Sequence, residues 1–175
     1  EINVLMSILS NHATASLVRV SGEIDVSALA RGEMSGETVA KRLEAASVLA
    51  YVDPYRAVTH NKGVMNGIHA VVLATGNDTR SAEASAHAYA CKEGQYRSMT
   101  KWEYLEDKGR LRGTIEIPMT LATVGGGTKV VPIARLAQEI LHVDSAQELG
   151  EVVAAVGLAQ NFSACRALVS EGIQE

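Results

Sequence analysis

The chain has 175 residues, of which 47% are hydrophobic and 21% are charged, and its formal net charge is −4. This composition predicts a packed core, and the length suits one domain or one domain with part of a second. The negative charge, without a long basic tract, argues against a nucleic-acid partner. Apolar runs far shorter than ~18 residues argue against a membrane span.

The two cysteines and the chain ends lead to further expectations. Cys91 and Cys165 lack the spacing of metal ligands, so we expect two buried thiols in the reducing environment of the cytoplasm. The sequence starts without methionine and stops at Glu175 without an evident cap or tail, so we expect a piece of a longer protein.

Two strands and a helix are predicted at the start of the chain. Runs of β-forming residues over 3–9 and 15–20 predict a strand pair with a short turn between them. Helical spacing of apolar residues over 37–51 predicts a helix. That helix should end at Asp53, because the residue before a proline avoids the α region.

Two more helices follow, on either side of a short polar turn. Apolar residues on one stripe predict a helix over 63–74, which places Lys62 at its N-terminal end. Since a helix N-terminus carries partial positive charge, a lysine there is unfavourable by up to ~1 kcal/mol. Asp78 is a suitable N-cap for the next helix, over 79–92.

The second half of the chain begins with a hairpin and ends in two helices. β-like runs over 99–104 and 111–117 flank a turn signal at 106–109. Helices are predicted over 130–141 and over 145–170, the latter opened by a capping box. The predicted fold class is therefore α+β, mostly helical, with a β-hairpin and a strand pair.

A lysine, an asparagine and a carboxylate surround the helix predicted over 63–74. Lys62 and Asn66 are one turn apart and face the same way, and a fold-back after the helix would bring Asp78 beside Lys62. An ammonium against apolar walls, with an acid nearby, can stabilise negative charge that develops on an oxygen. A solvent-facing lysine in a loop is the alternative, and the residues alone leave both open.

Several glycines and basic residues have two interpretations each. The run at 125–127 matches neither a dinucleotide nor a P-loop fingerprint, so it is either a turn or a set of N–H groups suited to an anion. Gly157, inside a helix, indicates close backbone packing or ligand approach. Arg56 is either a clamp for a carboxylate or phosphate or an ordinary surface arginine. His60 and His69 lack the spacing of metal ligands, so no metal site is predicted and His69 is expected to be partly buried.

Five motifs in register resemble the 3-hydroxy-3-methylglutaryl-coenzyme A (HMG-CoA) reductase family, most closely its soluble class II form from bacteria and archaea. The resemblance covers essentially the whole chain, and five motifs together are specific where any one alone is weak. The motifs are DPYRA at 53–57, HNKGVMNGI at 60–68, ATGND at 74–78, VGGGT at 124–128 and VGLAQN at 156–161.

The resemblance implies a reaction. Members of the family are oxidoreductases that interconvert HMG-CoA and mevalonate plus CoA by two hydride transfers with NADH or NADPH, in isoprenoid biosynthesis or in mevalonate degradation. No metal is implied. The resemblance further implies a homodimer or higher homo-oligomer with active sites across subunit interfaces. Apart from other copies of itself, the protein is expected to bind small molecules and neither nucleic acid nor membrane. Its expected location is the cytoplasm.

The resemblance also implies roles for individual residues. Lys62 would be the catalytic lysine that stabilises the oxyanion formed on hydride addition, and Asp78 the catalytic aspartate that hydrogen-bonds it and tunes its pKa. Substrate-binding roles fall on four residues: Arg56, Asn66, Gln160 and Asn161. The glycine segment near the dinucleotide would supply four cofactor-binding residues: Gly125, Gly126, Gly127 and Thr128.

Two domains are implied as well. Residues 1–33 would be the last strands of an inserted, ferredoxin-like small domain that binds the dinucleotide. Residues 34–175 would be the C-terminal part of the large, substrate-binding domain. The family's catalytic glutamate would lie before Glu1 and its catalytic histidine just beyond Gln174, so this fragment alone is expected to be inactive.

One position departs from the family pattern. His69 stands where the family usually has aspartate, on the same helical face as Lys62 and Asn66. The loss of that negative charge leaves a second interpretation open, a catalytically inactive homologue that binds CoA or an acyl group.

Overall fold

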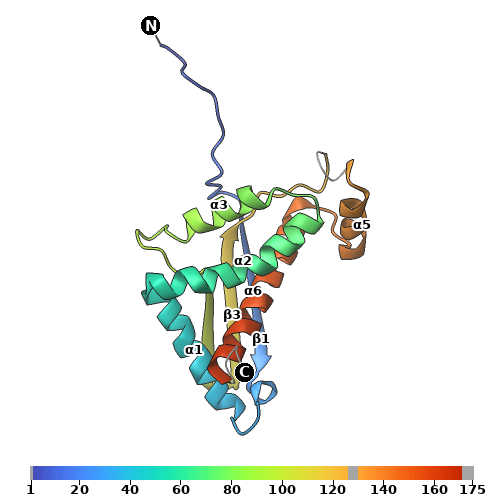
Figure 1. Ribbon diagram of the computed structural model, residues 1–175. Coiled ribbons are helices and arrows are strands. Elements are labelled where there is room, and N and C mark those ends of the chain that lie inside the picture. Colours follow the sequence, from blue (N-terminus) through green and yellow to red (C-terminus); the bar gives the residue numbers. More distant parts are fainter. Residues whose placement is uncertain (1, 126–129, 171–175) are drawn as a thin grey trace.

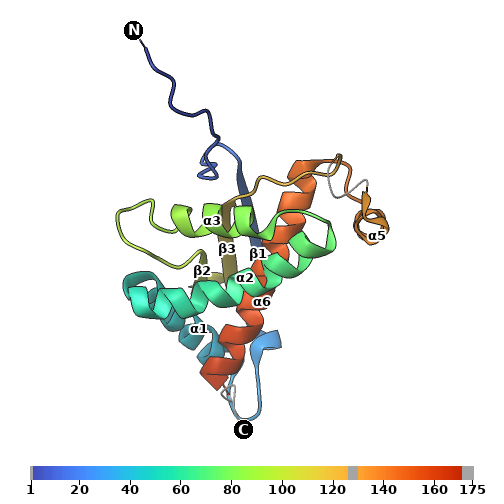
Figure 2. The same cartoon turned by 45° about the horizontal axis from the view of Figure 1, so that its top comes forward.

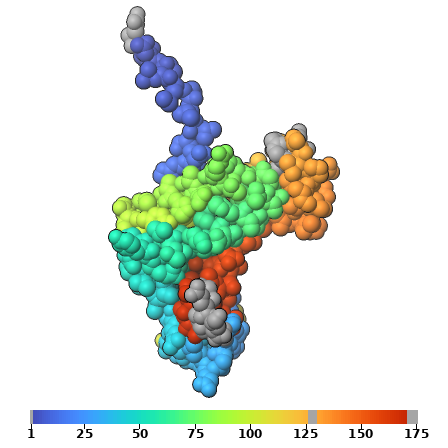
Figure 3. All heavy atoms as spheres, in the orientation of Figure 1, coloured from blue at the N-terminus to red at the C-terminus, as the bar shows by residue number. Residues whose placement is uncertain are grey.

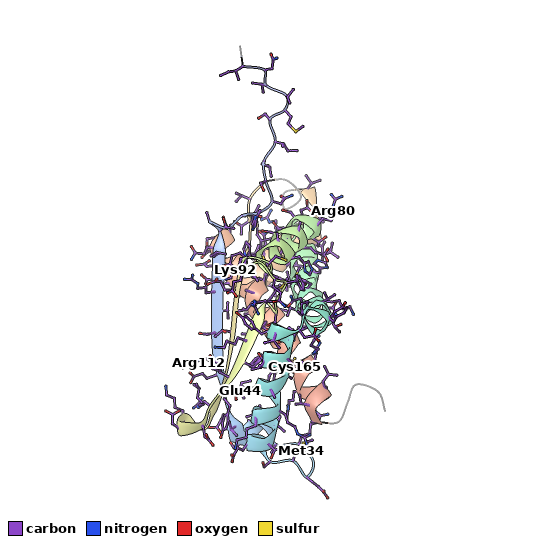
Figure 4. All side chains as sticks on the ribbon, turned by 90° about the vertical axis from the view of Figure 1, so that its left-hand side faces the viewer. Met34, Glu44, Arg80, Lys92, Arg112 and Cys165 are labelled. Atoms are coloured by element: carbon purple, nitrogen blue, oxygen red, sulfur yellow. The ribbon has the colours of Figure 1, made fainter. Side chains whose placement is uncertain are left out.

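The computed structural model describes residues 2–125 and 130–170, and it has the α+β architecture expected from the sequence. A three-stranded antiparallel sheet packs against helices (Figure 1). In a side view, α1, α2 and α6 lie on one side of this sheet (Figure 4). The strands are β1 (Leu17–Asp25), β2 (Thr100–Leu105) and β3 (Arg110–Pro118), in the order β1-β3-β2.

The helices agree closely with the predicted ones, except at the start of α2. They are α1 (Gly36–Val52), α2 (Pro54–Ala74), α3 (Thr79–Tyr89), α5 (Pro132–Leu141) and α6 (Ala146–Ser170), with short 3-10 turns η1 (Val26–Leu29) and η2 (Glu106–Lys108). The predicted N-cap of α6 is confirmed, since Glu148 N donates to Ser145 Oγ at 3.1 Å. The carboxylate of Glu148 accepts from Asp144 N at 2.8 Å, one residue before the partner expected in a capping box.

The predicted hairpin is confirmed as β2 and β3, which are joined by η2 and Gly109. Gly109 has φ 59°, a left-handed conformation that glycine adopts without steric cost. Gly113 lies opposite Trp102 in the hairpin, and a Cβ on Gly113 would lie 2.3 Å from the indole ring. The missing side chain therefore makes room for the indole against the sheet.

The prediction of a strand over 3–9 is wrong. These residues form no regular structure and extend away from the body of the molecule (Figures 1 and 3). Their apolar side chains are exposed, Leu5 for example by 91%. A strand needs a neighbour to satisfy its backbone groups, and no strand lies beside this segment in the described part of the chain.

β1 pairs instead with β3 along its whole length, from Leu17 opposite Pro118 to Asp25 opposite Arg110. This pairing joins residues 17–25 to the part of the chain that follows residue 33. The division into two domains at residue 33 stays a prediction, and the shared sheet counts against placing β1 in a separate domain.

α6 is a core helix that lies between α2 and the sheet (Figures 1 and 2). Its buried face carries Leu149, Val153, Leu158 and Cys165. By length and composition alone α6 could also cross a membrane. This is weak evidence for a membrane span, because α6 packs on the sheet and on α2. Cys165, labelled in Figure 4, is buried as expected, but Cys91 is exposed in the turn after α3, so the prediction for Cys91 is wrong.

α2 and α6 cross in close contact at two glycines. A Cβ on Gly67 would lie 2.9 Å from the carbonyl oxygen of Val156, and one on Gly157 would lie 2.8 Å from Cγ1 of Ile68. Both distances are too short for a real Cβ, so this approach requires glycine at both positions. The expectation that Gly157 marks close backbone packing is confirmed.

Gly67→Ala tests this crossing. The added methyl group meets the backbone of α6, which cannot move aside as a side chain can, so the free energy of unfolding should fall by about 1–3 kcal/mol. Gly63→Ala is the matched control in α2, because nothing lies within 4 Å of its added Cβ. It should raise stability by up to about 1 kcal/mol. Urea denaturation measures both, and equal effects would contradict the crossing.

Candidate functional site

α2 begins at Pro54 rather than at residue 63. Asp53 caps it by accepting a hydrogen bond from Tyr55 N at 3.0 Å, and the proline occupies the first turn. The Asp-Pro pair was expected only to end α1, whereas it also starts α2. Lys62 therefore lies in the middle of α2, and the prediction that it lies at a helix N-terminus is wrong.

The motif at 60–62 divides its side chains between core and solvent. His60 is 2% exposed and Asn61 is fully buried, whereas Lys62 is exposed. Asn66, one turn further on, is also exposed. Lys62 has no hydrogen bond or ion pair with any residue that the structure describes. One face of α2 thus presents an unpaired ammonium beside an amide.

His60 lies in a buried network that links α2, α6 and β2. Its Nε2 lies 2.6 Å from Thr100 Oγ1 and 3.1 Å from Asn161 Nδ2. Asn161 Oδ1 accepts hydrogen bonds from Thr100 Oγ1 and Trp102 Nε1, both at 2.9 Å. Burial, together with the charge of Arg56, lowers the pKa of His60 to about 4. The imidazole is therefore neutral near pH 7.

Asn61 makes a second attachment between α2 and the region that leads into β2. Its Nδ2 donates to the carbonyl of Arg97 and its Oδ1 accepts from Met99 N, both at 2.8 Å. These buried roles of His60 and Asn61 were not predicted from the sequence. Their helical spacing from Val64, on the apolar stripe of α2, is a signal that would have predicted their burial.

Asp78 caps α3 and does not contact Lys62 of the same chain. Its Oδ1 accepts from the backbone N of Arg80 at 2.9 Å and of Ser81 at 3.3 Å, which confirms the predicted N-cap. Lys62 lies about three turns, or about 18 Å of helix axis, before the end of α2. The structure therefore does not bring the two predicted catalytic residues together within one chain, and their roles stay predictions.

Asn77 joins the motif at 74–78 to the segment before the glycine run. Its Nδ2 donates to the carbonyl of Ala122 at 3.1 Å, and its Oδ1 accepts from Ala122 N at 2.7 Å. The sequence analysis gave Asn77 no such role. Gly125 follows with φ 82°. Three predicted cofactor-binding residues lie outside the described residues: Gly126, Gly127 and Thr128. The cofactor-binding role of this segment stays a prediction.

The other predicted substrate-binding residues lie in different environments. Arg56 is half-buried one turn before His60, without a hydrogen bond or ion pair in the described chain. Gln160 is exposed on α6, and its Cβ lies against Gly67 of α2. Asn161 is 2% exposed and engaged in the buried network. Its substrate-binding role stays a prediction, and its contacts favour a structural one.

His69 lies between α2 and α3 and is partly buried, as expected. Its Nε2 is 3.6 Å from Glu83 Oε2, and His87 Nε2 is 3.8 Å from the other oxygen of the same carboxylate. Glu83 thus lies near two histidines, but neither distance is that of a hydrogen bond, and the buried Nε2 of His69 has no hydrogen-bond partner in the described chain. Among the described residues, no group of three or more His, Cys, Asp or Glu side chains could hold a metal ion.

A second polar cluster, which the sequence analysis missed, surrounds Glu116 near the end of β3. The carboxylate accepts hydrogen bonds from Lys92, Tyr89 and Arg19, and these bonds, above all that from Lys92, lower the pKa of Glu116 to about 2. The cluster borders a cavity of about 470 Å³. Its cations are already paired with the acid, so it holds the end of α3 to the sheet (Lys92 is labelled in Figure 4).

Sequence comparison gives close relatives over nearly the whole chain. The family model described as hydroxymethylglutaryl-coenzyme A reductase matches residues 1–175. A 3-hydroxy-3-methylglutaryl-coenzyme A reductase from Archaeoglobus fulgidus is 48% identical over 98% of this chain and 38% of its own length. A relative from Borreliella burgdorferi is 39% identical over 98% of this chain and 39% of its own length.

Solved structures share the fold. A 3-hydroxy-3-methylglutaryl-coenzyme A reductase from Streptococcus pneumoniae matches with a TM-score of 0.93 and 45% identity, over 98% of this chain and 41% of that one. A class II reductase from the same organism, bound to NADPH in open conformations, matches with a TM-score of 0.91 and 45% identity, over 95% of this chain and 45% of that one. The chain thus spans about two fifths of the length of these relatives. It belongs to the hydroxymethylglutaryl-coenzyme A reductase family.

Proposed function

We propose that the protein is a hydroxymethylglutaryl-CoA reductase, which interconverts HMG-CoA and mevalonate plus CoA with NADH or NADPH. The observation that carries this proposal is the exposed face of α2, where Lys62 has no partner in the described chain and lies one turn from Asn66. Family membership supports the reaction. A structural neighbour bound to NADPH supports a dinucleotide as the second substrate.

Lys62 is the group that stabilises charge in this reaction. A bound reduced nicotinamide would supply the hydride for the thioester carbonyl carbon, whose oxygen would then become negative. The Lys62 ammonium donates a hydrogen bond to that oxygen, and its full charge opposes the one that develops. No carboxylate of the described chain is paired with Lys62, so its charge is available to the substrate.

Arg56 fits the binding of an anionic part of the substrate. Its guanidinium is half-buried and has no acidic partner in the part of the chain that the structure describes. A carboxylate or phosphate there would be held by charge-assisted, bidentate hydrogen bonds. Asn66 and Gln160, both exposed near the crossing of α2 and α6, offer amide groups that would orient the substrate.

Asp78 would serve Lys62 across a subunit interface. Within one chain α2 keeps the two residues apart by about 18 Å of helix axis. A second copy related by a twofold axis would bring its Asp78 to this Lys62, and the reverse would hold at the second site. We therefore infer a homodimer or higher homo-oligomer. From family membership we further infer that it forms or degrades mevalonate and that it is located in the cytoplasm.

Lys62→Ala in the full-length protein tests the role of the lysine. Loss of the ammonium removes a main partner of the oxyanion, so kcat should fall by about 10²–10³-fold. Oxidation of NADH or NADPH that depends on HMG-CoA measures the rate. Lys101→Ala is the control, because Lys101 is an exposed lysine of β2 paired with Glu103 at 2.6 Å, and it should keep the wild-type rate.

Two outcomes would contradict this proposal. A Lys62→Ala rate within a few-fold of wild type would show that the assigned role is wrong. A wild-type protein whose Tm rises with CoA but which oxidises no dinucleotide would favour the inactive CoA-binding homologue suggested by His69.

Mixed dimers test the sharing of the site. Lys62→Ala and Asp78→Asn should each be nearly inactive alone, and asparagine keeps the N-cap of α3. A mixed dimer has one site with both residues intact and one with neither, so a statistical mixture should recover up to about a quarter of the wild-type rate. Differently tagged chains verify that subunits exchange. Mixtures that exchange but stay inactive would place both residues in one subunit.

A further inference from the structure

The orientation of Asn161 follows from its neighbour Trp102. Trp102 Nε1 can only donate, and it lies 2.9 Å from Asn161 Oδ1, so the amide oxygen faces the indole. The amide nitrogen therefore faces His60 Nε2, at 3.1 Å, and Thr100 Oγ1 lies 2.6 Å from the same ring nitrogen. The other ring nitrogen, Nδ1, lies 3.9 Å from Cys165 Sγ. The imidazole is thus held by β2 and α6 at once.

The surroundings of His60 disfavour a charged imidazole. Its titratable neighbours in the described chain are Arg56 on α2 and Cys165 on α6, and its partner Thr100 on β2 is neutral. Burial and the guanidinium charge both oppose protonation. The imidazole of the folded chain is therefore neutral near pH 7.

Helix geometry connects this buried residue to the exposed face of α2. Consecutive residues are ~100° apart around an α-helix, so His60 and Lys62 point about 200° apart. Lys62 and Asn66 are separated by only about 40°. Attachment of His60 to α6 and β2 therefore turns the face with Lys62 and Asn66 outward.

We propose that His60 is a positioning residue, which fixes the rotation of α2 and with it the face that Lys62 and Asn66 present to the substrate. The inference rests on the proposed function, because that function gives the face its purpose. His60 is 2% exposed and does not touch the substrate. Without the imidazole, buried polar groups of Thr100 and Asn161 lose a partner, and α2 shifts as they find others.

His60→Ala and His60→Gln in the full-length protein test this role. His60→Ala removes the hydrogen-bonding ring, and because a shift of about 1 Å can cost about 10²-fold, kcat should fall by about that factor with KM less affected. In His60→Gln the side-chain amide, which can donate and accept, takes the place of Nε2, so kcat should return to within about 10-fold of wild type. Rates are measured at a temperature and pH at which circular dichroism shows that every variant is folded. His12→Gln, at an exposed position, is the control.

The outcomes separate this role from the proposed function. An active wild type with a His60→Ala kcat within about threefold of it overturns the positioning role alone. Equal losses in His60→Ala and His60→Gln also overturn it, because a hydrogen-bonding group at position 60 then has no special part. A wild type without reductase activity overturns the proposed function, and the positioning role with it.

The neutral imidazole also predicts a pH dependence of stability. The pKa of His60 is about 4 in the folded chain against an ordinary 6.5, so the unfolded chain binds an extra proton between these values. Wild-type stability should therefore fall as the pH decreases from 6.5 towards 4, and His60→Gln should lack this contribution. The pKa of Glu116 is lowered from 4.5 to about 2, so its contribution to stability is lost only at a lower pH. Urea midpoints near pH 7 and about pH 5 measure the effect, and equal decreases in both proteins would contradict a neutral ring.

Discussion

The close crossing of α2 and α6 is the constraint on which the candidate site depends. Gly67 and Gly157 each cost roughly 1 kcal/mol of helix propensity, and in return the two backbones approach to a distance that a Cβ forbids. Apolar contact alone would leave the helices free to rotate, because hydrophobic burial has no direction. The hydrogen bonds of His60 and Asn61 do have direction, so the glycines set the distance and the polar groups set the rotation.

The groups inside this crossing are polar but uncharged. Leaving a buried polar group without a partner costs more free energy than its hydrogen bond contributes when it is made. Such a network therefore favours the one arrangement in which every group is paired. A charged group in the same place would add the cost of removing it from water. α2 accordingly keeps its neutral His60 and Asn61 inside and its charged Lys62 outside. The same helix thus separates the residues that hold it from the lysine proposed to stabilise the oxyanion.

Local signals in the sequence were sufficient for most helices and for the hairpin. N-caps such as Asp78 and Ser145 fix helix starts through a few neighbouring atoms. The predictions were wrong where a structure depends on residues that are distant in the sequence, or where one short motif has two structural roles. The strand expected over 3–9 lacks a neighbour, and the Asp-Pro pair at 53–54 both ends one helix and starts the next. The fold-back to Lys62 fails for a different reason, because the helix from Lys62 to its end at Ala74 is continuous and about 18 Å long.

An ammonium in open water stabilises an oxyanion weakly, because the high dielectric constant screens its field. Lys62 would become effective if a second surface covered the exposed face of α2 and excluded water. In the proposed dimer that surface would carry Asp78 of the partner subunit, because α2 keeps the Asp78 of the same chain about 18 Å of helix axis away. A twofold axis beside α2 would meet both needs at once, by covering the lysine and by supplying the aspartate.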